Sequence, residues 1–151
     1  MTTPSVAVID ALNSLLEAEA NSIFHFVGEG SPYVKDAGPE VKQMLIEMSR
    51  RLDRHSRELE QLIRRLGGEP AHPPTPQAEE QYLSFLSLPF LLPKLVEAKN
   101  LMIQRYHSAL KVVAAIEPAK ELLSRQLQEI NAGLEDLNQI AANVALHGDP
   151  S

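Results

Sequence analysis

The chain has 151 residues, no cysteine and a formal net charge of −6. This length suits one domain with a substantial core, and we expect a single domain over residues 1–151. The absence of cysteine excludes disulfides, thiolate metal sites and thiol catalysis, and it fits a cytoplasmic location. The acidic balance argues against nucleic acid and anionic membrane as partners. The most apolar run, Leu83–Leu92, is about half as long as a membrane span.

Four amphipathic segments predict four helices, and no segment predicts a strand. Breakers after Val27 end the first segment, while Pro39 and the Gly67-Gly68 pair suit the start and the end of the second. The start of the third is less sharply marked and lies between Ser87 and Pro93. The predicted helices cover residues 6–27, 39–66, 89–115 and 118–145, with a loose tail at 146–151.

The lengths of the connections predict the topology. Short links make the first and second helices antiparallel, and likewise the third and fourth. The second link is a proline-rich stretch of about twenty residues, and extended chain covers about 3.3 Å per residue against 1.5 Å in a helix. This stretch can therefore travel the length of the bundle. The prediction is an all-α, up-down-down-up four-helix bundle with one long crossover between helices two and three, as in ferritin-like folds.

Two polar residues interrupt the apolar stripes of the first two helices. Glu19 follows Leu12 and Leu16 in one stripe, and His55 lies between Leu52 and Leu59 in the other. Steps of three and four place every member of such a stripe on the buried side of its helix. A carboxylate and an imidazole in the interior need compensation by a metal ion, a counter-charge or a hydrogen-bond network.

Three segments resemble bacterioferritins. Residues 12–26 look like the first helix of that family, and Glu19 falls on its ligand glutamate. Residues 53–59, followed by 66–70, are similar to the second helix and its exit turn, with His55 at the ligand histidine. Residues 97–101 resemble the third helix. The resemblance implies a bacterioferritin-like bundle with a centre for two metal ions.

Most of the ligand positions implied by this resemblance hold other residues. Working di-iron members carry a glutamate on helices one and three, and Glu-x-x-His on helices two and four. Here Leu52 stands at the second-helix glutamate and Lys94 at the third-helix glutamate. On the fourth helix, Gln126 and Glu129 stand where glutamate and histidine are expected. The resemblance therefore implies a degenerate di-iron site.

Two interpretations remain open. In the first, Lys94 is an internal cation between Glu19 and Glu129, His55 is a hydrogen-bond partner, and no cofactor binds. The role is then non-catalytic: structural, or the binding of a protein or a small apolar ligand.

In the second interpretation, one divalent ion, iron or zinc, is held by Glu19, His55, Glu97 and Glu129, and the protein serves iron handling or oxygen chemistry. The register of the third helix separates the two, because a helix that starts at Pro93 leaves Lys94 in an exposed first turn.

We also expect self-association, most simply as a homodimer. The first helix carries a second apolar stripe on Val8, Leu15 and Ala18, and Leu83–Leu92 adds further apolar surface. Apolar surface of this extent is typical of an interface.

Overall fold

A computed structural model of the chain describes residues 6–20, 39–71 and 88–147. These residues form four helices: α1 (Val6–Ala20), α2 (Pro39–Arg65), α3 (Leu88–Val112) and α4 (Glu117–His147). The predicted continuation of the first helix over residues 21–27 lies outside the described part of the chain, and so do residues 148–151 of the predicted tail. The loose tail was predicted to begin at residue 146, but α4 continues to His147.

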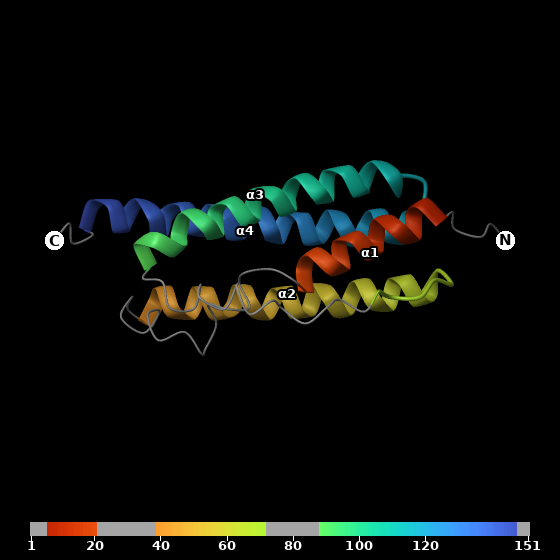
Figure 1. The fold of residues 1–151 in the computed structure, drawn as a ribbon, viewed down its shortest axis with the longest axis horizontal. Coiled ribbons are helices and arrows are strands. Elements are labelled where there is room, and N and C mark those ends of the chain that lie inside the picture. Colours follow the sequence, from red (N-terminus) through yellow and green to blue (C-terminus); the bar gives the residue numbers. More distant parts are fainter. Residues whose placement is uncertain (1–5, 21–38, 72–87, 148–151) are drawn as a thin grey trace.

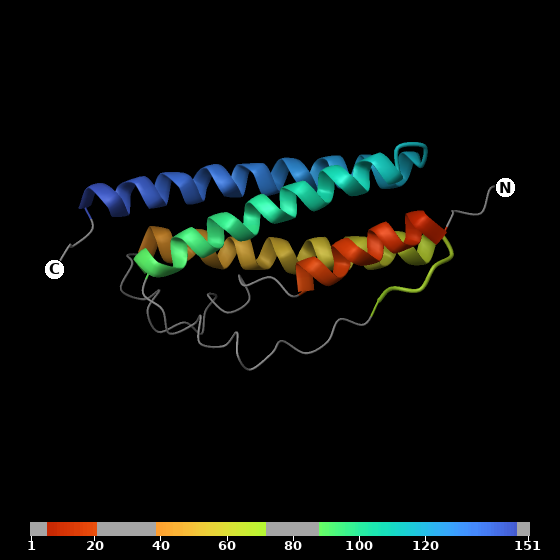
Figure 2. The ribbon, with the colours of Figure 1, turned by 45° about the horizontal axis from the view of Figure 1, so that its top comes forward.

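The helices run in the predicted directions. Figure 1 shows α1 and α2 antiparallel, α2 and α3 parallel, and α3 and α4 antiparallel. Each helix packs on two neighbours, because α1 contacts α2 and α3 while α4 contacts α3 and α2. Figure 2 shows this arrangement from a second side, with α4 above α1 and α2, and α3 crossing from the level of α2 at its start to α4 at its end. The predicted all-α bundle with a long connection between the second and third helices is confirmed.

The end of α2 follows from two glycines. Gly67 has a φ of 87°, a left-handed conformation that a side chain disfavours. The amide of Gly68 then donates to the carbonyl of Ile63 at 2.9 Å, and the amide of Gly67 donates to that of Arg64 at 3.0 Å. These hydrogen bonds supply donors to carbonyls of the last helical turn, which would otherwise have none.

Asn13 of α1 holds the chain that leaves α2. Its side-chain Nδ2 donates to the carbonyl of Glu69 at 3.0 Å, and its Oδ1 accepts from the amide of Ala71 at 2.7 Å. One side-chain amide therefore fixes the first residues of the crossover against α1.

The apolar interior is divided into two clusters. Leu59, Met102 and Ile130 belong to the first cluster, which also includes Leu12 and Leu16 of α1. The second cluster lies further along the bundle and includes Leu52, Leu95 and Leu137 of the three longer helices. Along α2, α3 and α4, the buried residues between these clusters are His55, Lys99 and Gly133. A polar layer therefore separates the two halves of the core.

The predicted second stripe of α1 does not face outward. Val8 is 5% exposed and Leu15 is 1% exposed, and both belong to the first apolar cluster. The prediction that this stripe is open surface was wrong, because α1 packs on two helices and so buries two stripes. Among the helices described, none is long and apolar enough to cross a membrane.

Candidate functional site

Glu19 lies at the centre of the polar layer. Its carboxylate is fully buried, and Oε1 accepts a hydrogen bond from the hydroxyl of Tyr106 at 2.7 Å. Nδ1 of His55 lies 3.3 Å from the same oxygen. Three helices therefore supply this contact: α1 the acid, α2 the imidazole and α3 the phenol.

His55 joins the buried acid to a second one. Its Nε2 lies 3.3 Å from Oε2 of Glu129 on α4, which also forms an ion pair with Arg54. One imidazole therefore lies between two acidic side chains, with one ring nitrogen facing each of them.

Gln126 completes the network on α4. Its Oε1 lies 2.8 Å from the hydroxyl of Tyr106, and its Nε2 lies 3.3 Å from both the carbonyl of His55 and Oε1 of Glu58. The phenol has one proton for two acceptors, Glu19 and Gln126. Burial raises the pKa of Tyr106 well above its usual value, and the charge of Glu19 raises it further. The phenol therefore keeps its proton and remains a donor.

Lys99 adds a second cation to this layer. The side chain is 5% exposed, and burial lowers its pKa from 10.5 to about 8, opposed by Glu19 and reinforced by Arg51. A group with this pKa remains mostly an ammonium at neutral pH. The ammonium of Lys99 is therefore a cation in the surroundings of Glu19.

The sequence predicted that a different lysine, Lys94, would be the buried cation beside Glu19. Lys94 is exposed, so the predicted Glu19–Lys94–Glu129 network does not form. The helix does not start at Pro93 either, because α3 begins at Leu88 and carries Pro93 inside it. A step of three from Leu95 leads to Ala98, and a step of four leads to Lys99. Because the predicted stripe continued through the apolar Ala98, Lys99 was not expected to be buried.

The four residues expected to hold one metal ion are only partly brought together. Glu19, His55 and Glu129 meet, whereas Glu97 is exposed on α3 and does not join them. Tyr106 was expected to be core and is buried, but its hydroxyl proves to be part of the site. Its place on an apolar stripe gave no signal for that role.

These side chains are poorly suited to a two-metal centre. Leu52, where the resemblance implies a bridging glutamate, is 2% exposed and packs in the second apolar cluster. Gln126 is neutral and already bonded, and Lys99 brings a positive charge to the same layer. Within residues 6–20, 39–71 and 88–147, no group of three or more histidine and acidic side chains is placed to hold a metal ion. The residues described do not fit a centre that needs several free carboxylates.

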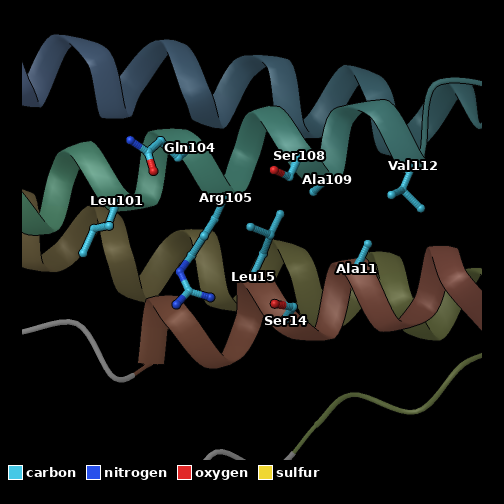
Figure 3. Close-up of a pocket in the computed structure, with 9 residues that line it drawn as sticks. All are labelled: Ala11, Ser14, Leu15, Leu101, Gln104, Arg105, Ser108, Ala109 and Val112. Carbon is cyan, nitrogen blue, oxygen red and sulfur yellow. The ribbon is translucent and has the colours of Figure 1, made fainter.

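A separate groove lies on the surface between α1 and α3 (Figure 3). Arg105 extends from α3 toward α1, and Leu15 extends from α1 toward α3. Leu101 and Val112 line the groove and are 51% and 44% exposed. The groove has a volume of about 420 Å³ and contains none of the polar layer's side chains. Its other lining residues are Ala11, Ser14, Gln104, Ser108 and Ala109.

Comparison with known proteins identifies the fold. Neither a protein-family model nor a curated protein sequence matches this chain. Solved structures do match. The bacterioferritin of Desulfovibrio desulfuricans, described with a diiron site, superposes with a TM-score of 0.79 at 20% identity, covering 94% of this chain and 82% of that one.

An open-pore ferritin from Archaeoglobus fulgidus gives a similar result in two structures. The TM-scores are 0.75 and 0.77, both at 15% identity, with 97% and 100% of this chain covered and 90% and 92% of the other. At these identities the likeness establishes the fold alone. The chain is a ferritin-like four-helix bundle, structurally similar to bacterioferritin and archaeal ferritin.

Proposed function

We propose that this ferritin-like bundle is a non-catalytic protein whose centre is held by its own side chains instead of metal ions. One observation carries the proposal: protein side chains already occupy the surroundings of the two central acids. His55 lies 3.3 Å from Glu19 and 3.3 Å from Glu129. The ammonium of Lys99 interacts electrostatically with Glu19, and Arg54 forms an ion pair with Glu129. In a metal centre, the metal ions supply the positive charge at this place.

The hydrogen bonds of the two neutral polar side chains, Tyr106 and Gln126, support the same function. The hydroxyl of Tyr106 lies within hydrogen-bond distance of Glu19 and Gln126, and Gln126 lies within hydrogen-bond distance of the carbonyl of His55 and of Glu58, so these five residues are connected. A well-connected buried network stabilises one arrangement of the helices. The role that follows is a scaffold, acting through its surface as a structural protein or by binding a protein or small apolar ligand. We also propose that the protein is located in the cytoplasm.

Anaerobic loading with Fe²⁺ tests the proposal. After dialysis, metal bound per chain is measured by mass spectrometry in the natural protein and in Glu19→Gln. We expect no iron that depends on Glu19, and no faster oxidation of Fe²⁺ than with the variant. Two ions per chain lost in Glu19→Gln would refute the proposal. One such ion would favour the alternative, a single-metal site on Glu19, His55 and Glu129.

We also propose that the chain self-associates as a homodimer through α3. Phe90, Leu101 and Val112 are 69%, 51% and 44% exposed. They are spaced by eleven residues, close to three helical turns, so they share one face of the helix. Sedimentation velocity at micromolar concentration should give a dimer, and Leu101→Glu should shift it to monomer. A monomeric natural protein would exclude this interface.

A further inference from the structure

The exposed side chains of α3 are arranged symmetrically about Leu101. Phe90 and Val112 lie eleven residues before and after it, and both are exposed apolar side chains. Glu97 and Arg105 lie four residues before and after it, and both are exposed and carry opposite charges. Steps of four and eleven residues stay on one side of a helix. This side of α3 therefore has an apolar centre, apolar ends, and one acid and one base between them.

Neither charged side chain has an ion-pair partner in the part of the chain that the structure describes. Glu97 precedes the apolar centre of this side of α3, and Arg105 follows it at the same distance. In a symmetric dimer both subunits use the same surface, so each contact occurs twice with the two residues exchanged. A surface whose acid and base lie at equal distances from its centre can therefore pair both charges with a copy of itself.

The groove between α1 and α3 provides space for an additional side chain. Figure 3 shows Leu101 at one end of the groove and Val112 at the other. Between these ends it is lined by the small side chains of Ser14, Ser108 and Ala109. Phe90 lies about 16 Å from Leu101 along the helix, on the side away from Val112. A Phe90 side chain beside Val112 must therefore come from a second copy of the chain.

We propose that two copies of this chain pair through antiparallel α3 helices, with the two-fold axis at Leu101, and that Phe90 of each copy enters the groove of the other. The inference rests on the self-association proposed above, and it specifies which residues meet. About an axis at Leu101, residues at equal distances before and after it face each other. Phe90 then meets the partner's Val112, and Glu97 meets the partner's Arg105.

The sides of the helix agree with this pairing. A step of four residues turns about 40° more than a full turn, so Glu97 and Arg105 lie on opposite sides of the line through Leu101. A two-fold rotation exchanges these two sides and also reverses the helix direction. The acid of one copy and the base of the other are therefore brought to the same side and the same height. Opposite charges that face each other across an interface favour the pairing that aligns them.

Charge reversal tests which residues meet. Sedimentation velocity measures the dissociation constant of the dimer for the natural protein, Glu97→Arg, Arg105→Glu and the double variant. Each single variant places two like-charged pairs across the axis, and we expect it to weaken the dimer about tenfold or more. The double variant restores both pairs with the charges exchanged and should dimerise like the natural protein. An equimolar mixture of the two single variants should form a heterodimer, because each supplies the charge that the other lacks.

Matched controls make the same charge changes at exposed residues of α4. Glu135→Arg and Lys120→Glu should leave the dissociation constant unchanged. A double variant that dimerises no better than the single variants would overturn the inference while leaving the proposed self-association in place. A natural protein that sediments as a monomer would overturn the self-association, and this inference with it.

Disulfide formation locates the axis independently, because the natural chain has no cysteine. Leu101→Cys should give a disulfide-linked dimer on mild oxidation, since the axis brings residue 101 of each copy beside the other within the reach of a disulfide. Val112→Cys should give none, because its two copies would lie about 33 Å apart along the paired helices. Cross-linking of Val112→Cys, or none of Leu101→Cys, would show that the axis does not lie at Leu101.

Discussion

The hydroxyl oxygen of Tyr106 lies 2.7 Å from Oε1 of Glu19, and both side chains are fully buried. This bond joins α3 to α1 at the layer where the apolar core is interrupted. Its partner is a carboxylate that water does not reach, so no solvent molecule can readily replace the phenol.

Tyr106→Phe tests the strength of this bond. A hydrogen bond to a charged group contributes about 2 kcal/mol, and we expect the free energy of unfolding to fall by about that amount. Urea unfolding followed by circular dichroism measures it. In a double-mutant cycle with Glu19→Gln, the two losses should add up to more than the loss in the double variant. Additive losses would mean that the two side chains do not interact.

The buried Lys99 predicts how stability varies with pH. Its pKa is about 8 in the folded protein and 10.5 ordinarily. Between these values the unfolded chain binds more protons than the folded one, so stability rises with pH. Below pH 8 both states are protonated and the full cost of burying the charge remains.

We therefore expect a gain of about 2 kcal/mol in unfolding free energy between pH 8 and pH 10, relative to Lys99→Met. Subtracting the variant's curve removes groups common to both proteins, including Tyr106. The raised pKa of Tyr106 acts in the other direction, with its stabilisation lost as pH rises above 10. Parallel curves for the two proteins over this range would contradict the prediction.

Gly133→Ala should change the melting temperature differently in two backgrounds. Alanine in a helix is favoured over glycine by about 1 kcal/mol, but its Cβ would lie 3.3 Å from Cε of Lys99. In the natural protein we expect this crowding to cancel or reverse the gain in melting temperature. In Lys99→Ala, where the space is open, the full gain should appear. The same shift in both backgrounds would show that Gly133 does not accommodate the lysine.

Gly67→Ala should destabilise the bundle without any clash. A Cβ at this position would have nothing within 4 Å, but the residue has a φ of +87°. The strain of a side chain in that conformation is about 1 kcal/mol, and thermal unfolding should detect it. Gly67→Asn is the matched control, because asparagine tolerates the left-handed conformation better. Equal losses in both variants would point to a cause other than backbone strain.

Much of the fold could be predicted from the spacing of apolar residues and the lengths of the loops. The same spacing placed Glu19 and His55 inside, where they are 0% and 1% exposed. It could not choose between Ala98 and Lys99, because both continue the stripe from Leu95 and a lysine is seldom buried. That choice depends on Glu19 and on the space beside Gly133, which are contributed by other helices.

The network around Tyr106 could not be predicted for a related reason. Periodicity reports which side of a helix is buried, and an aromatic residue on that side fits an apolar core equally well. Whether its hydroxyl finds a partner depends on the axial positions of α1 and α4 relative to α3. Those positions are set by packing over the whole length of the bundle.

The side-chain amide of Asn13 binds the start of the crossover as a backbone peptide group of a β-strand binds a neighbouring strand. Its amide offers Glu69 a donor and Ala71 an acceptor, as a peptide group of a neighbouring strand does. The chain that leaves α2 is therefore turned back along α1, and the first step toward a parallel α3 is taken by one side chain. These two hydrogen bonds favour a chain that continues past the end of α2 over one that turns directly into an adjacent antiparallel helix.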